Sequence, residues 1–214
     1  MIKAVIFDMD GVLLDSEPFW QQAQSQVFGE LGRPMSQADC EATMGLRIDQ
    51  VVALRYPDLI NPPSQPEVVA RIVAEVNRLI RLEGTPKEGL DHALGLIRDQ
   101  GLRVGLATSS PMTMVHNVLE ILGIAHHFEA LHSAEVERFG KPHPDVYIHA
   151  AEKLGLAPEA CLAVEDSFNG LLAAKAARMK ALIVPDPALV GDPRLAIADL
   201  ELPSLARLEA AHLR

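Results

Sequence analysis

The sequence has few cysteines, no block of basic residues and no long apolar run. Its two cysteines, Cys40 and Cys161, lie far apart and suggest neither a disulfide framework nor a metal site. A formal net charge of −10 without a run of Lys or Arg argues against nucleic acid as a partner, because that binding needs cations against phosphates. No stretch reaches the about 20 apolar residues that cross a bilayer, and Asp8 interrupts the first apolar stretch too early for a signal peptide. We therefore expect a cytoplasmic protein that binds no membrane.

What the chain does have is enough apolar material for a large core. Of its 214 residues, 49% are hydrophobic, which is typical of a globular domain. Four short apolar runs are typical of buried strands: 3–7, 103–107, 161–164 and 180–184. Helical periodicity lies between them, as where Leu90, Leu94 and Ile97 share one face of a helix that Gly101 closes. Apolar strands that alternate with amphipathic helices predict an α/β fold, with a parallel sheet covered on both sides.

The segment from 16 to 83 breaks this alternation. It carries helical patterns that end at Gly32 and Gly84 and has no convincing strand. An all-helical stretch after the first strand predicts a second, inserted domain at 16–83. The core domain would then comprise residues 1–15 and 84–214, with hinges at the two crossings.

Oxygen-bearing side chains follow three of the predicted strands, at the point where each strand ends. They are, strand by strand, Asp8 and Asp10, Thr108 and Ser109, and Glu165 and Asp166. Ligands of parallel sheets bind beyond the carboxyl ends of the strands, so these side chains should meet at one edge. Four carboxylates at that edge would repel one another without a cation, and ligands that are all oxygen predict Mg²⁺. We expect Asp8, Asp10 and Asp166 to bind the metal ion. For Glu165 two roles remain open, as a direct ligand of the metal or as a residue that supports the other ligands.

The other groups at this edge suit a phosphate. Thr108 and Ser109 begin a predicted helix, where hydroxyls and backbone N–H groups favour an anion. Lys141 in "GKPHPD" offers a point charge for phosphate oxygens. Asp8 would attack phosphorus and form an aspartyl-phosphate, while Asp10 acts as general acid and then as general base. Lys141 and the metal would stabilise the charge on the transferred group.

Four motifs carry a resemblance to a known family. "DMDGVLLDSE", "ATSS", "GKPHPD" and "VEDSFNG" occur in the order and spacing of the motifs of the haloacid dehalogenase-like phosphotransferases. The resemblance implies a Rossmann-like, three-layer core with a helical cap of type 1 between the first two motifs. Within the family, the chain looks most similar to the bacterial hexitol and 2-deoxyglucose-6-phosphate phosphatases. This resemblance implies a Mg²⁺-dependent hydrolase of small sugar or sugar-alcohol phosphates.

Two related activities fit the residues less well. Relatives that cleave carbon–halogen bonds lack the second aspartate, which is present here as Asp10. The β-phosphoglucomutases resemble the chain too, but that resemblance implies a cap histidine where Trp20 stands and a basic residue where Met44 stands. Both departures favour transfer of the phosphoryl group to water. A sugar-phosphate sensor without turnover remains a further alternative, although pure binding has no use for the acid pair.

Residues that contact the substrate are harder to predict than those that do chemistry. Trp20 and Arg47 of the insertion and Asn169 of the core are the candidates for substrate binding. Arg178 stands where many relatives have glycine at a helix end, which should affect capping more than chemistry. We expect a monomer, and the sequence leaves open which sugar phosphate it prefers.

Overall fold

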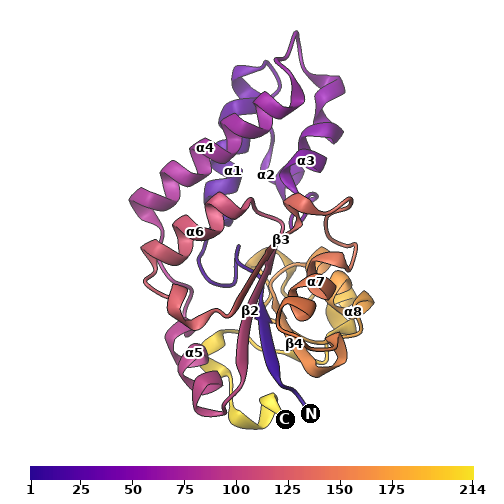
Figure 1. The fold of residues 1–214 in the computed structure, drawn as a ribbon. Helices are drawn as coiled ribbons and strands as arrows, with labels where there is room; N and C mark the ends of the chain where they lie inside the picture. The colour runs from indigo at the N-terminus through magenta and orange to yellow at the C-terminus, as the bar shows by residue number, and fades with distance from the viewer.

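The computed structural model describes residues 1–214 and shows a β-sheet with a group of helices beyond one of its ends (Figure 1). The sheet has six strands in the order β3-β2-β1-β4-β5-β6, and every neighbouring pair is parallel. The strands are β1 (Ala4–Phe7), β2 (Arg103–Thr108), β3 (Ala130–Ser133), β4 (Cys161–Glu165), β5 (Lys180–Ile183) and β6 (Leu200–Glu201). The predicted α/β fold with a parallel, Rossmann-like sheet is confirmed.

The four predicted strands are present to within one residue at each end. The sequence did not predict the two strands at the sheet's edges. β3 reads "ALHS", half of it polar, and β6 is only two residues long, so neither has the apolar run that marks the central strands. An edge strand is covered on fewer sides than a central one, and its sequence is correspondingly less apolar.

Helices cover both faces of the sheet. Their bounds are α5 (Leu90–Asp99), α6 (Met112–Ile121), α7 (Asp145–Lys153) and α8 (Phe168–Ala176). Val5 and Phe7 of β1 pack in one apolar cluster with α5 and α6, while Ala4 and Ile6 pack in another with α7 and α8. Successive side chains of a strand point to opposite faces, so this division shows that β1 is buried on both sides. The result is the three-layer arrangement that the sequence predicted.

The remaining four helices form a separate lobe, here called the cap helices, at the top of Figure 1. They are α1 (Glu17–Glu30), α2 (Gln37–Glu41), α3 (Ile48–Arg55) and α4 (Gln65–Glu83), and no strand lies among them. The longest, α4, buries Val68, Ile72 and Val76 at four-residue spacing, the stripe that an amphipathic helix turns towards its neighbours. Both chain termini lie at the opposite end of the molecule (Figure 1). The domain boundaries at 16 and 84 stay a prediction.

The two crossings between the cap helices and the core lie beside each other. Leu14 forms an isolated antiparallel bridge with Pro86, and the backbone N–H of Lys87 donates to the Leu13 carbonyl at 2.9 Å. Lys87 Nζ also lies 2.8 Å from Asp15 Oδ1. A pair of adjacent crossings is the arrangement about which one lobe can rotate against another.

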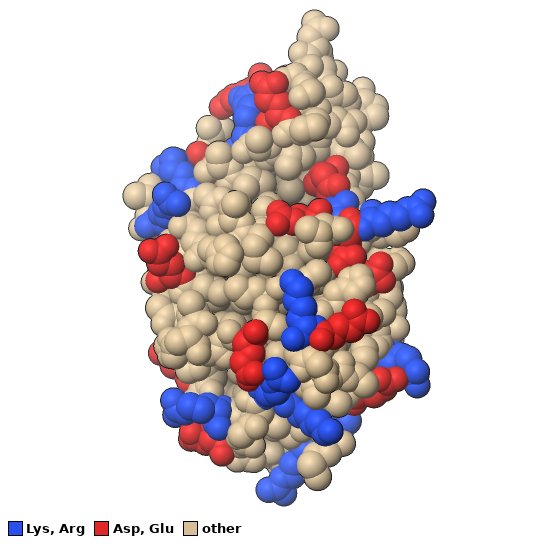
Figure 2. All heavy atoms as spheres, viewed as in Figure 1, with Lys and Arg blue, Asp and Glu red and all other residues tan.

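Charged side chains of both signs lie on the surface. On the face drawn in Figure 2, acidic and basic side chains are interspersed and no extended basic patch is seen. No helix combines the length and the apolar character needed to span a membrane.

Arg178 takes the left-handed conformation after α8. Its φ is +68°, whereas the residues that usually occupy this position after a helix are glycines. For a residue with a Cβ, the left-handed region costs about 1–2 kcal/mol. The unusual residue noted in the sequence is therefore a local source of backbone strain.

Candidate active site

The carboxyl ends of β1, β2 and β4 lie in register at the edge nearest the cap helices. Phe7 of β1 pairs with Leu106 on one side and Val164 on the other. The backbone N–H of Asp8 donates to the Val164 carbonyl at 2.9 Å, which continues the ladder by one step. The residues that follow these strands therefore meet, as the sequence predicted from the parallel order.

Three buried carboxylates, here called the acidic cluster, lie at this edge: Asp8, Glu165 and Asp166. They are 6%, 0% and 6% exposed, and one ligand oxygen from each lies within 4.8 Å of the others. Lys141 is 1% exposed, and its Nζ lies 3.0 Å from Asp8 Oδ1 and 2.7 Å from Glu165 Oε1. One ammonium group faces three carboxylates, so the site is short of positive charge.

The electrostatics of the acidic cluster follow from this imbalance. Burial raises the pKa of Asp8 to about 7, with Lys141 opposing the rise and Glu165 adding to it. Burial alone would lower the pKa of Lys141, but Asp8 and Glu165 outweigh it and hold the pKa above its usual value. The lysine stays charged, and the carboxylates favour any further cation that reaches them.

Glu165 is occupied by partners of its own. Besides Lys141, its Oε1 accepts from the hydroxyl of Tyr147 at 2.6 Å, and its Oε2 accepts from Ser167 Oγ at 3.2 Å. Tyr147 is fully buried on α7 and was not among the predicted site residues. These contacts fix Glu165 as the group that orients Lys141.

The carboxylate of Asp10 lies outside the acidic cluster. Its Oδ1 accepts hydrogen bonds from Ser16 Oγ at 2.7 Å and from the indole Nε1 of Trp20 at 2.8 Å. Its Oδ2 accepts from Ser110 Oγ at 2.6 Å. The structure thus brings Trp20 to Asp10, but it does not bring the Asp10 side chain among the predicted metal ligands. Ser16 and Ser110 are further members of the site, and each lies within one of the four quoted motifs.

Thr108 ends β2 and Ser109 follows it; both precede α6, whose N-cap is Pro111, so neither residue begins the helix as the sequence analysis expected. Thr108 is fully buried, and its Oγ1 accepts from the backbone N–H of Ser110 at 3.0 Å, which leaves the hydroxyl proton free to be donated. Ser109 Oγ donates to the carbonyl of Gly45, in the loop before α3, at 3.2 Å. Thr108 is therefore placed at the sheet edge, while Ser109 links the edge to the cap.

Two predicted substrate contacts instead join the cap to the core. Arg47 Nη1 donates to the carbonyls of Ala134 and Glu137, at 2.5 Å and 2.8 Å. Asn169 Nδ2 donates to the carbonyl of Met44 at 2.8 Å. In this closed arrangement neither side chain points into the pocket beside the acidic cluster.

That pocket is lined by Asp8 and Asp10 from the core and by polar and apolar side chains of the cap, among them Trp20, Gln24 and Glu17. Gln24 is 6% exposed, and its Oε1 has no hydrogen-bond partner. Burial raises the pKa of Glu17 from 4.5 to about 7. The sequence analysis missed both residues, although Gln24 lies one helical turn after Trp20 and so shares its face of α1.

Sequence comparisons show the family. A family model described as haloacid dehalogenase-like hydrolase matches residues 2–178. The chain belongs to this family. It is similar to hexitol phosphatase B of Escherichia coli (strain K12), with 45% identity covering 99% of this chain and 96% of the relative. It is also similar to the fructose-1-phosphate phosphatase YqaB of the same organism, with 32% identity over 84% of this chain and 95% of the relative.

Among solved structures, phosphate-bound CbbY from Rhodobacter sphaeroides superposes with a TM-score of 0.89 and 24% identity, covering 100% of this chain and 99% of that one. At this identity the likeness supports the fold alone. The haloacid dehalogenase-like fold is thus found by two independent comparisons, and the chain is a hydrolase.

The acidic cluster fits the hard divalent cation that the family implies. Asp8 Oδ1 is buried and, although paired with Lys141, accepts no hydrogen bond. Gly11 has a φ of +70°, and a Cβ there would lie 1.7 Å from Asp166 Oδ2, so the glycine leaves the room that this carboxylate needs. Asp8 and Asp166 would hold such an ion, whereas Glu165 is engaged by Lys141 and Tyr147.

Proposed function

We propose that this hydrolase is a Mg²⁺-dependent phosphomonoesterase that acts on small sugar or sugar-alcohol phosphates through an aspartyl-phosphate on Asp8. The proposal depends on one observation. Two aspartates that are two residues apart in the sequence have side chains in different surroundings. Asp8 lies beside Lys141 in the acidic cluster, whereas Asp10 is held by Ser16, Trp20 and Ser110 at the pocket. Two carboxylates in two environments suit two roles, one as nucleophile and one as proton carrier.

The residues divide the reaction in the following way. Asp8 Oδ attacks phosphorus, the bond to the ester oxygen breaks, and Asp10 gives its proton to the leaving alcohol. Asp10 then takes a proton from a water molecule, whose oxygen attacks the phosphorus and releases Asp8 and inorganic phosphate. Lys141, fixed by Glu165, balances charge on the transferred group, and Thr108 and Ser109 bind its oxygens at the end of β2. When bound by Asp8 and Asp166, Mg²⁺ supplies further positive charge to the phosphoryl oxygens.

The pocket wall supports a polyhydroxylated leaving group. The amide of Gln24 has an unpaired oxygen, and the carboxyl of Glu17 titrates near neutrality. Such groups gain hydrogen bonds from the hydroxyls of a sugar or a hexitol, and an apolar substrate would leave them unpaired. Together with the full-length similarity to a hexitol phosphatase, this favours hexitol phosphates and 2-deoxyglucose 6-phosphate as the first substrates to test. The proposed enzyme is a cytoplasmic monomer.

The decisive variant is Asp8→Asn, which keeps the size of the side chain and removes the nucleophile. We expect it to fold, to bind Mg²⁺ more weakly and to release no phosphate from a panel of hexose, deoxyhexose and hexitol phosphates. The wild-type enzyme, quenched in acid during turnover, should carry one phosphoryl group on the peptide that contains Asp8, as detected by mass spectrometry. Wild-type turnover by the Asp8→Asn variant contradicts the covalent mechanism.

The same panel separates the alternatives. Steady formation of glucose 6-phosphate from β-glucose 1-phosphate and a bisphosphate primer, with little inorganic phosphate, would identify a mutase. Tight binding of a sugar phosphate with undetectable hydrolysis would identify a sensor. The indole of Trp20 favours neither the mutase nor the sensor. Its N–H can only donate, so it can orient the Asp10 carboxylate but cannot exchange protons with it.

A further inference from the structure

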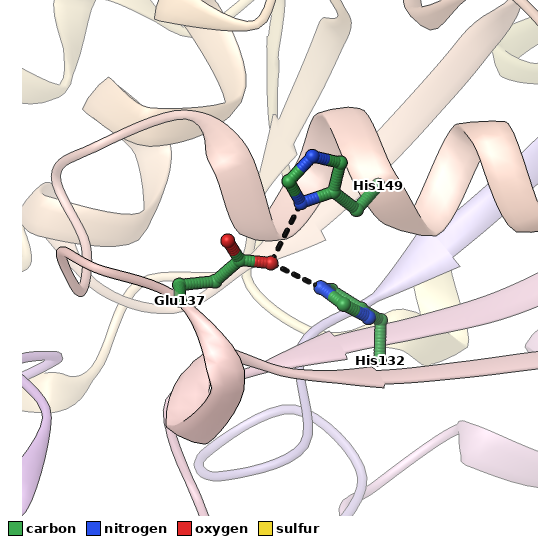
Figure 3. A group of neighbouring side chains, drawn as sticks. All are labelled: His132, Glu137 and His149. Atoms are coloured by element: carbon green, nitrogen blue, oxygen red, sulfur yellow. Dashed lines mark hydrogen bonds and ion pairs between the residues drawn. The ribbon is translucent and has the colours of Figure 1, made fainter.

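A second group of metal-type side chains lies away from the acidic cluster, between edge strand β3 and helix α7. His132 is in β3, Glu137 follows the single-turn 3₁₀ helix Ala134–Val136, and His149 is in α7. Figure 3 shows that the three side chains converge from these three segments. We call them the histidine–glutamate group.

Both imidazoles contact the same carboxylate oxygen. His132 Nε2 lies 2.5 Å and His149 Nδ1 lies 2.7 Å from Glu137 Oε1. The rings stand nearly perpendicular, at 80°, with their centroids 5.5 Å apart. Figure 3 shows the other oxygen of Glu137 turned away from both rings. Three ligand atoms within 4.8 Å of one another leave a place for a single ion between them after a small adjustment.

The protonation of the group suits a cation. Burial lowers the pKa of His132 and outweighs the opposing hydrogen bond with Glu137, so this ring is neutral near pH 7. Burial would raise the pKa of Glu137, but the hydrogen bonds with the two histidines lower it, so the carboxylate is ionised. His149 has a raised pKa because it is bonded to Glu137, and its proton must leave before a metal binds.

Burial and access are divided between the two histidines. The side chains of His132 and Glu137 are 6% and 7% exposed, while that of His149 is 42% exposed. The Nδ1 of His132 is buried without a partner, and it would carry the proton of the neutral ring when Nε2 binds a metal. The half-exposed His149 gives an ion a route in and leaves water for its remaining coordination position.

We propose that His132, Glu137 and His149 bind one divalent transition-metal ion of the Zn²⁺ type, independently of the proposed Mg²⁺ site. Two imidazoles and one carboxylate are a ligand set that Zn²⁺ adopts in proteins, whereas the oxygen-only acidic cluster suits Mg²⁺. The chemistry of the ligands therefore separates the two sites.

The site would be structural, because the segment it fastens carries functional residues. The backbone carbonyl of Glu137 accepts from Arg47 of the cap, and Lys141 follows four residues later. An ion that ties Glu137 to β3 and α7 holds the anchor point of this loop. We therefore expect the ion to raise thermal stability without acting on the substrate.

The test uses the full chain, stripped with a chelator and then kept in excess Mg²⁺ so that the acidic cluster is occupied. Titration with Co²⁺, which reports nitrogen ligands through its visible absorption, should saturate at one ion per chain. The band should disappear in His149→Ala, where the half-exposed histidine is replaced by a good helix former. It should persist in Asp166→Asn and in the matched control His126→Ala, which removes an exposed histidine elsewhere.

Zn²⁺ gives a second readout. It should raise the melting temperature of the wild type and of His126→Ala by several degrees and leave that of His149→Ala unchanged. Glu137→Gln, which keeps the shape but not the charge, should weaken Co²⁺ binding at least tenfold. The proposal is overturned if the wild type takes up no Co²⁺ at equimolar concentration, since the group would then be a hydrogen-bonded triad only. It is equally overturned if the His149→Ala variant retains the band or the thermal shift. Neither outcome bears on the phosphatase mechanism, because neither depends on turnover.

Discussion

Replacing Gln24 with leucine should make the protein more stable and less active. Gln24 lies in a pocket wall with a side-chain oxygen that is buried and unpaired, and leaving such a group unsatisfied costs about 1–3 kcal/mol. Leucine has a similar volume and no polar atom, so we expect a gain of about 2 kcal/mol. For a chain of this size, 1 kcal/mol corresponds to about 2–4 °C, which predicts a rise in melting temperature of roughly 4–8 °C.

Activity should change in the opposite direction. If Gln24 pairs with a substrate hydroxyl, its loss should lower kcat/KM for a hexitol phosphate by about 10- to 100-fold, the effect of one or two hydrogen bonds. Hydrolysis of an aryl phosphate, which has no hydroxyl to offer, should stay within about twofold by the same reasoning.

The matched control for Gln24→Leu is Gln22→Leu, the same change on the exposed face of α1. It should alter stability by less than about 0.5 kcal/mol and leave the kinetics unchanged. Unfolding followed by circular dichroism and steady-state kinetics on both substrates would settle the matter. An unchanged melting temperature in Gln24→Leu, or an equal loss on both substrates, would refute the assignment of Gln24 as an unpaired group that serves the sugar.

Three further predictions concern neighbouring features. Trp20→Phe removes one of three donors to Asp10 and should lower kcat about tenfold, while Phe19→Leu, which removes no hydrogen bond to Asp10, should keep it within about twofold in the same assay. Burial raises the pKa of Glu17 from 4.5 to about 7, so ionisation of this carboxyl destabilises the fold progressively between these two pH values. The free energy of unfolding of Glu17→Gln should match that of the wild type near pH 4.5 and exceed it near pH 8 by on the order of 2–3 kcal/mol, and an equal difference at both values would contradict this. Arg178→Gly should be more stable than Arg178→Ala by about 1 kcal/mol in denaturant unfolding. Both variants lose the exposed ion pair with Glu159, but only glycine adopts the left-handed φ without strain. Equal stability of the two variants would mean that the backbone at this position is unstrained.

The central strands could be read from the sequence because their apolar runs report burial on both faces. The edge strands could not, because a strand with one neighbour needs no such run, and β3 carries His132 and Ser133 as half of its residues. Helix ends were predicted where a glycine takes a left-handed φ, as at Gly32 and Gly101. Arg178 adopts the same left-handed conformation although it is not a glycine. The residue that marks a helix end in the sequence is therefore missing there.

The site shows the same division between local and long-range information. Asp8, Thr108 and Asp166 were predicted to meet because each follows a parallel strand, and parallel order alone fixes their meeting. The direction in which a side chain points depends on partners far along the chain. Asp10 turns to Ser110, a hundred residues away, and Arg47 turns to carbonyls some 90 residues away, so no local pattern could predict these contacts.

The contacts of residues 44–47 explain how the cap can both seal the pocket and open it. Met44 and Gly45 offer backbone carbonyls to Asn169 and Ser109, and Arg47 donates to carbonyls of the core. A hydrogen bond that water can replace is worth about 0.5–1.5 kcal/mol, so this small set holds the closed arrangement by only a few kcal/mol. An imbalance of that size leaves a minor open population of about 0.1–10%, sufficient for exchange of substrate and product. Asp10 depends on the same closure, because Trp20 reaches it from the cap helix α1. If Asp10 is the proton carrier, as proposed, it would be held by all three donors only while the cap lies against the core, which would join exclusion of bulk water to the start of chemistry.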